Sequence, residues 1–196
     1  NHFSISVESP LANLHVSGNN GLLVDSSFDI SSTENAAIEG PGTRLFFHGP
    51  RAAIRAGHLD GSGIYSGSAW NTENIGRYSS AMGKNTAASG NFSTVFSQDN
   101  YGGGAYSTVL GGLFNNAYEH FSFTLGRRSN AVHTGVFLWS DSNDKSNTST
   151  EMDQALIFAE NGVGINTNYT YETIGITNYP AVLTLQGQSV LASNIN

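Results

Sequence analysis

The sequence predicts an all-β protein built from stacked coils, and two observations carry this prediction. Four near-copies of one phrase stand in the middle of the chain: GRYSSAMG from Gly76, GNFSTVFS from Gly90, GAYSTVLG from Gly104 and EHFSFTLG from Glu119. Their aromatic third residues are 14, 14 and 15 positions apart, and only 12% of the 196 residues are charged, whereas 23 are glycine. A short fixed period with many turn residues is typical of stacked β units.

Before the repeats, the alternation of apolar residues predicts short strands over 2–7, 12–16 and 22–24, with a turn at 18–21. Two further strands are expected over 44–48 and 51–55, joined by the Gly49-Pro50 turn. A Gly- and Ser-rich segment, 57–74, reads as an exposed loop leading into the repeats. The chain begins at Asn1 without a signal-like apolar run, and we expect it to be a fragment of a longer protein.

After the repeats, strands are expected over 136–139, 155–159, 163–165 and 181–185. The segment 140–153 is polar and reads as a loop, and Asn161-Gly162 predicts a hairpin. Helical periodicity is nearly absent. These expectations divide the chain into four parts: a β connector (1–40), a β-hairpin with a Gly/Ser loop (41–75), the repeats (76–139), and a C-terminal loop with a β-rich domain (140–196).

A period of 14 residues has room for two short strands and two turns, because a strand advances ~3.3 Å per residue and neighbouring strands lie ~4.8 Å apart. Two apolar columns then follow the first strand of each coil. One holds Met82, Phe96, Leu110 and Leu125, and the other holds Ala81, Val95, Val109 and Thr124. A coil this thin encloses only one apolar column, so the second must be covered by other copies of the chain. The sequence therefore predicts an oligomer, and three chains around an axis suit a thin fibre.

The repeats resemble the head domains of trimeric autotransporter adhesins. The Ser-x-Ala-x-Gly core of that family is similar to residues 79–83 and 107–111, and its Asn-x-Ala element to residues 85–87, 115–117 and 130–131. The chain departs from the family pattern at three places. Ser97 stands in place of a glycine, residues 98–104 lack the Asn-x-Ala element, and the next repeat is expected to start at Gly135, later than the period requires. The flanking phrases are similar to modules of secreted bacterial fibres, including the mosaic trimeric fibres of predatory bacteria, and to phage tail fibres.

This resemblance implies an intertwined homotrimer with a left-handed parallel β-roll flanked by small β-rich domains. It also implies an extracellular or cell-surface location and adhesion to the surface of another cell, through a glycan or a protein. Two alternatives stay open: a purely structural spacer or trimerisation module, and a phage-type tail fibre with polysaccharide-degrading activity.

Composition and motifs argue against other classes of function. The net charge of −7 disfavours nucleic-acid binding, which needs a basic face. No stretch approaches the roughly 20 apolar residues of a membrane helix, and without cysteine there is no disulfide or thiolate metal site. Nucleophile-elbow, Walker and His-Glu-x-x-His patterns are absent, and the glycines of 162–167 lack the third position of a dinucleotide motif. We therefore predict a protein that is not an enzyme and takes no cofactor or metal.

Two loops carry the residue types that bind sugars, an aromatic face beside polar side chains. The first has Tyr65 and Trp70 with Asp60 and Asn71, and the second has Trp139 with Asp141. The alternative is that both tryptophans cap the ends of the roll, which is favoured because both stand in phrases that bracket the repeats.

Two groups of residues have the chemistry of metal ligands. His58 with Asp60 could form a ligand pair, and the oxygen-rich group Asp141, Asn143 and Asp144 could suit calcium. Neither has the spacing of a known metal loop, so a surface loop and a solvated turn are the preferred interpretations.

Overall fold

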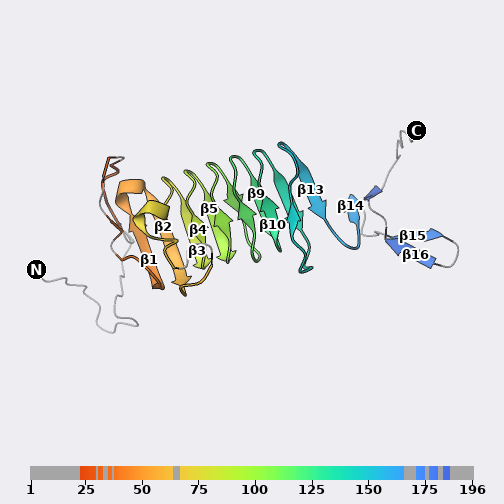
Figure 1. Ribbon diagram of the computed structural model, residues 1–196, viewed down its shortest axis with the longest axis horizontal. Helices are drawn as coiled ribbons and strands as arrows, with labels where there is room; N and C mark the ends of the chain where they lie inside the picture. Colours follow the sequence, from red (N-terminus) through yellow and green to blue (C-terminus); the bar gives the residue numbers. More distant parts are fainter. Residues whose placement is uncertain are drawn as a thin grey trace, which may run out of the picture.

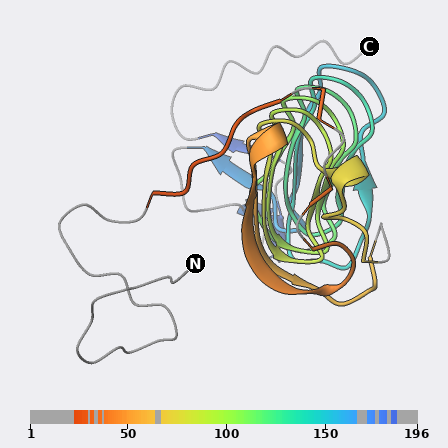
Figure 2. The same ribbon diagram turned by 90° about the vertical axis from the view of Figure 1, so that its left-hand side faces the viewer.

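The computed structural model is all-β and contains a parallel β-solenoid, in agreement with the predicted fold class. It describes residues 23–29, 31–32, 35–36, 38–63, 67–165, 171–174, 177–180 and 183–185. The coils are stacked along the long axis of the molecule (Figure 1), and seen along that axis they superpose as a flattened loop (Figure 2). In the described part of the chain, helix is limited to two 3-10 turns, η1 (Gly49–Arg51) and η2 (Thr72–Asn74).

The large sheet of the solenoid has eight strands. In sheet order they are β1 (Gly42–His48), β2 (Ala53–Leu59), β3 (Ser80–Lys84), β5 (Thr94–Gln98), β7 (Thr108–Val109), β9 (Phe123–Gly126), β11 (Phe137–Ser140) and β13 (Ala155–Phe158). β1 is antiparallel to β2, and every other neighbouring pair is parallel. The predicted tight pair before the repeats is confirmed as β1 and β2.

The small sheet is entirely parallel and has five short strands. They are β4 (Ala87–Ala88), β6 (Tyr101–Gly102), β8 (Asn116–Ala117), β10 (Ser129–Ala131) and β12 (Asn147–Thr148). Each coil gives one strand to each sheet, from β3–β4 to β11–β12, so the solenoid has five coils of this kind. Parallel stacking gives every strand in the middle of the solenoid a hydrogen-bonded neighbour on both sides.

Beyond β13 lie two small two-stranded sheets (Figure 1): β14 (Val163–Ile165) pairs in parallel with β17 (Leu183–Leu185), and β15 (Tyr171–Ile174) is antiparallel to β16 (Thr177–Pro180). The predicted hairpin at Asn161-Gly162 is wrong, because β13 pairs with β11 and β14 pairs with β17. The strand expected over 22–24 is not formed at Leu23 and Val24, and the strands expected over 2–7 and 12–16 lie outside the described residues.

The interior between the two sheets is one column of side chains from each. The large sheet contributes Ala81, Val95, Val109, Thr124 and Leu138, and the small sheet contributes Ala88, Gly102, Ala117 and Ala131, all of them buried. The space is narrow: a Cβ at Gly102 would lie 2.7 Å from a methyl carbon of Val95. The coil therefore has no room for a second column of large side chains.

The entry to each large-sheet strand is a turn with a residue in the left-handed region. Tyr78, Phe92, Tyr106 and Phe121 have φ of 57°, 60°, 59° and 56°. Gly135, with φ of 74°, continues this column, because its N–H donates to the carbonyl of His120 and Phe137 pairs with Phe123. The next repeat therefore starts at His133, one regular period after Glu119, and the expected start at Gly135 is wrong.

The longer spacing between the third and fourth repeats is accommodated at Gly111. Val109 pairs with Val95, which is 14 residues earlier in the chain. Leu113 bridges to Gln98, which is 15 residues earlier, so one extra residue lies between Val109 and Leu113. Gly111 has φ of 151°, and a Cβ there would meet no atom within 4 Å. A single residue thus bulges out of the third coil without shifting the coils that follow.

A column of buried polar side chains holds the corner between the two sheets, at Thr86, Asn100, Asn115, Ser129 and Asn147. Asn100 Oδ1 accepts from the N–H of Asn115 at 2.8 Å, and Asn115 Oδ1 accepts from the N–H of Ser129 at 2.9 Å. Residues 98–104 lack the Asn-x-Ala element, as the sequence shows, and Asn100-Tyr101-Gly102 takes its place beside Asn115-Asn116-Ala117. Asn85 and Asn130, by contrast, bond outside this column, to Asp99 and to Ser146.

The N-terminal end of the interior is closed by a buried arginine. Arg55 is fully buried on β2 and donates to the carbonyls of Ser79 and Ala88 and to the Ser79 hydroxyl. Burial, with a smaller effect of the Arg51 charge, lowers the pKa of Arg55 to about 9, so the side chain is still cationic at neutral pH. Arg55 stands in register with Ala81, and its guanidinium satisfies backbone groups of the first coil.

Candidate functional site

The outer face of the large sheet carries one apolar residue from every strand. The pairing places Leu45 beside Ala56, Ala56 beside Met82, and Met82 beside Phe96. Towards the other end, Leu125 pairs with Trp139 and Trp139 with Ile157, and Leu110 stands between the two groups on β7's coil. We call this set the outer row: Leu45, Ala56, Met82, Phe96, Leu110, Leu125, Trp139 and Ile157.

The outer row is accessible to solvent along its length. The exposed fractions are 74% for Leu45, 50% for Leu110 and 50% for Ile157, and the remaining members are half-buried or at the border of exposure. None of the eight is charged. In the five coils, each member directly follows an interior residue along the chain, so the alternation of the strand turns it outward. The thin coil has no second interior space in which these side chains could be buried.

Polar residues border the outer row on one side. Two residues before Leu45 on the antiparallel β1, and two residues after the outer-row member on β2, β3 and β5, stand Thr43, His58, Lys84 and Gln98, which pair with one another in that order. On the other side, Ser80, Thr94 and Thr108 form a row of hydroxyl side chains. The row is apolar at both ends, with Ile54 beside Ser80 and Phe123 beside Thr108, and the ring centroids of Phe123 and Phe137 are 5.4 Å apart. An apolar strip with a polar margin is the arrangement of a protein–protein interface with its rim.

A second exposed feature is a ladder of stacked aromatic rings at the left-handed turns. Ring centroids of Tyr78, Phe92, Tyr106 and Phe121 follow one another at 4.8, 4.9 and 5.1 Å, and Phe28 stacks on Tyr78 at 5.0 Å. The repeat spacing indicates the four repeat residues, but nothing in the sequence indicates that Phe28 extends the stack. The ladder ends at Gly135, which has no side chain.

The predicted core residues fall into two groups. Ala81, Val95 and Val109 are fully buried inside the coil. Met82, Phe96, Leu110 and Leu125 lie on the outer row instead, so within one chain they are not core residues.

Trp70 does not offer its ring to a ligand, contrary to the expectation of a sugar contact. It is fully buried, its Nε1 donates to the carbonyl of Thr86 at 2.8 Å, and Arg44 lies over its ring at 5.5 Å. Its neighbours Leu59, Ala69 and Ala87 place it against the small sheet at the N-terminal end of the solenoid. Tyr65, its expected partner, lies outside the described residues.

The polar residues expected beside Trp70 are occupied with local contacts. Asn71 Oδ1 accepts from the N–H of Gly40, and Asp60 forms an ion pair with Lys84 at 2.9 Å. Hydrogen bonds from Ser62 and from Lys84 hold the pKa of Asp60 well below its usual range. His58 Nδ1 lies 2.7 Å from the hydroxyl of Thr43, so the two residues of the expected metal pair have different partners: Thr43 for His58 and Lys84 for Asp60.

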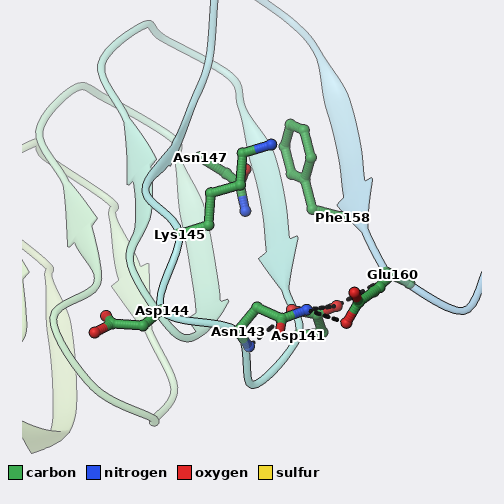
Figure 3. Close-up of a pocket in the computed structure, with 8 residues that line it drawn as sticks. Asp141, Asn143, Asp144, Lys145, Asn147, Phe158 and Glu160 are labelled. Atoms are coloured by element: carbon green, nitrogen blue, oxygen red, sulfur yellow. Dashed lines mark hydrogen bonds between the residues drawn. The ribbon is translucent and has the colours of Figure 1, made fainter.

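Of the oxygen-rich residues after β11, Asp141 and Asn143 lie together and Asp144 lies apart from them. Asp141 accepts from the N–H groups of Asn143 and Glu160, which lower the pKa of its carboxyl, and Asn143 donates to Glu160 Oε2 at 2.9 Å. Asp144 points the other way (Figure 3) and pairs with Arg127 and Arg128. Within the described ranges no three His, Asp or Glu side chains gather closely enough to hold a metal ion.

Trp139 and Asp141, the second expected sugar site, do come together. They line one hollow of about 750 Å³ with Gly112, Gly126, Arg127 and Ser142. Trp139 belongs to the outer row and caps neither end of the solenoid. Asp141 also borders a neighbouring polar hollow of about 490 Å³ that contains Lys145 and Phe158 (Figure 3).

In the described part of the chain, no helix combines the length and apolarity needed to cross a bilayer. Comparisons of this chain with protein-family models, with curated proteins and with solved structures gave no match.

Proposed function

We propose that this chain is a non-enzymatic head module of a homotrimeric, extracellular fibre that recognises the surface of another cell. The observation that carries the proposal is the outer row, an apolar strip that follows the solenoid from β1 to β13. Burying a leucine, methionine or phenylalanine side chain stabilises a protein by about 1.5–3 kcal/mol. Seven of the eight members have large apolar side chains, all of them partly exposed, and covering the exposed parts contributes free energy to the association of copies of the chain.

The direction of the strip supports assembly around a common axis. The outer row runs along the stacking direction of the coils, so copies can pack lengthwise with their strips facing inward. A closed ring of identical chains pairs every strip with those of its neighbours, so no strip is left free to promote open-ended association. The choice of three chains, the left hand of the coil, the intertwining and the flanking domains rest on the resemblance of the repeats to trimeric adhesin heads.

The resemblance also supports the adhesive role and the location outside the cell. In a trimer, each loop and hollow is present three times on one rigid body. Weak individual contacts to a glycan or protein on another cell then combine through their effective concentration.

The assembly is tested by measuring the mass of the chain in solution and of two matched variants. Light scattering should give three times the chain mass of 20.8 kDa for the wild type and for Asn91→Asp, which adds a charge at an exposed turn. Leu110→Asp puts the same charge on the outer row and should give a folded monomer, recognised by an unchanged β-type circular dichroism spectrum. A monomeric wild-type chain at micromolar concentration would contradict the proposal, as would a trimer that Leu110→Asp leaves intact.

A purely structural spacer is the second candidate. It is favoured by the burial of Trp70, which removes the more aromatic of the two expected sugar sites from the surface. A trimeric chain that binds no cell-surface glycan or protein would support the spacer.

A further inference from the structure

We infer that the hollow beside Trp139 binds a neutral pyranose sugar, with the Trp139 indole as its stacking platform. The inference deepens the proposed adhesive function by naming a ligand class and a site. It rests on that function for its biological meaning, and it requires the Trp139 end of the outer row to stay open in the assembly. All the residues that line the hollow come from a single chain.

The floor of the hollow is bare backbone, and the stacking of the coils keeps it so. Gly112 and Gly126 have φ of 86° and 93°, and a Cβ at either would lie 1.8 Å from the carbonyl oxygen of the next coil. A side chain at either position would therefore be strained at the present spacing of these coils. In the second coil the corresponding stretch carries Ser97 and Gln98, so the notch is confined to the later coils.

One wall is aromatic and half-buried. Trp139 pairs with Leu125 and Ile157 on β9 and β13, which fix its backbone between two strands. A pyranose ring presents a face of C–H groups that packs on such an indole, while its hydroxyl groups point outward. A backbone held in a sheet loses little conformational freedom when a ligand binds to its side chain.

The other wall supplies hydrogen-bonding groups around the aromatic platform. Arg127 donates through Nη1 to the carbonyl of Ser142 at 3.2 Å and lies 3.1 Å from Asp144 Oδ1, so its guanidinium is fixed in place. Arg127 Nε is buried and has no hydrogen-bond partner among the described residues. The Asp141 carboxylate, which accepts from the N–H of Glu160 at 2.7 Å, is anchored as an acceptor for sugar hydroxyls.

The charges favour a neutral ligand over an anionic one. The two charged residues that line the hollow, Arg127 and Asp141, have opposite signs, and Asp144 next to it pairs with both Arg127 and Arg128. A sugar acid would therefore find no excess of positive charge in the hollow to attract it. Small polar groups around one apolar wall are the usual composition of a ligand site.

The test uses the whole chain and panels of neutral di- and trisaccharides, built from hexoses and N-acetylhexosamines, beside an acidic panel with uronic or sialic acid. Binding is measured by saturation-transfer NMR and titration calorimetry. At least one neutral sugar should bind, and Trp139→Leu should weaken it at least tenfold, whereas Trp139→Phe should restore part of the affinity because it keeps a flat ring. The control Tyr118→Leu, an exposed ring near the small sheet, should leave the affinity within twofold.

The outcomes separate this inference from the trimer. A trimeric wild-type chain that binds no neutral sugar, that binds only acidic sugars, or that binds equally well after Trp139→Leu overturns the inference and leaves the assembly standing. A monomeric chain whose sugar binding needs Trp139 supports the inference and overturns the assembly. Because Trp139→Phe and Trp139→Leu are compared in the same assay with their circular dichroism spectra, a loss of fold is told apart from a loss of binding.

Discussion

At the residue scale, successive positions in one strand have opposite environments. Val109 is fully buried between the two sheets, while Leu110, the next residue, has half of its side chain in water. The period-two alternation of a strand explains this difference. The sequence alone shows that both columns are apolar, but which one faces inward depends on the size of the facing side chains, Ala88, Gly102 and Ala117.

One interior residue departs from the apolar pattern of its column. Thr124 is fully buried next to Val109, and its hydroxyl has no hydrogen-bond partner among the described residues. A buried, unpaired polar group costs about 1–3 kcal/mol. We therefore expect Thr124→Val, which keeps the shape of the side chain, to raise the free energy of unfolding by about 1 kcal/mol.

Chemical denaturation monitored by circular dichroism measures this change. The control is Thr94→Val, at the row of hydroxyl side chains on the outer face, where the substitution should leave the free energy of unfolding nearly unchanged. A destabilised Thr124→Val variant would show that the hydroxyl has a partner, such as a buried water.

At the scale of the element, the coil turn is set by close approach of one backbone to the next. A Cβ at Gly76, Gly90 or Gly104 would lie 2.0 Å from a carbonyl oxygen of the following coil. The repeat makes these glycines visible in the sequence, and it predicts the coil for that reason. In the fourth copy the same position is Glu119, so the turn there tolerates a side chain.

Gly90→Ala should therefore separate two coils and lower the free energy of unfolding by about 3 kcal/mol, at the upper end of the effects of single substitutions. The matched control is Glu119→Ala at the equivalent position, which already carries a Cβ and should change stability little. Thermal unfolding of the two variants checks this ordering. Equal melting temperatures would mean that the coils are spaced more loosely than the carbonyl contacts indicate.

The register of the outer coils is harder to predict than the repeats themselves. Residues 50–57, 133–140 and 151–158 occupy the same positions in the stack as the four repeats, as the pairing of β2, β11 and β13 shows. Their sequences differ from the repeat because the turn needs only a residue that accepts the left-handed conformation. That residue is Ala52, Gly135 and Asp153 in the three segments, in that order. The burial of Trp70 at the N-terminal end of the solenoid agrees with the favoured interpretation of this residue as a cap and not with the alternative sugar contact. The sequence could not decide between the two, because the burial depends on how the segment before the first repeat folds over the small sheet.

At the scale of the whole molecule, the solenoid is modular, since each coil contacts chiefly its two neighbours. Ser89 precedes one complete coil, 90–103, and Gly104 begins the next at the same position. Deleting residues 90–103 joins equivalent points and should give a folded chain shortened by one coil. The outer row would lose Phe96 and stay continuous, so we expect the same oligomeric state as in the full-length chain.

Circular dichroism and light scattering of the deletion variant measure fold and assembly. The control is deletion of residues 90–96, half a coil, which breaks the register of every later strand and should abolish the cooperative unfolding transition. If both deletions fold equally well, the coils are not interchangeable units.

The reversed strand at the N-terminal end has a consequence for how the solenoid avoids fibril growth. A stack of parallel coils is an open template, and an exposed parallel edge recruits further strands as amyloid does. β1 runs against the rest of the sheet, and Arg55 puts a cation at the mouth of the interior. An incoming coil would meet a strand of the wrong polarity there, so runaway polymerisation is blocked at that end.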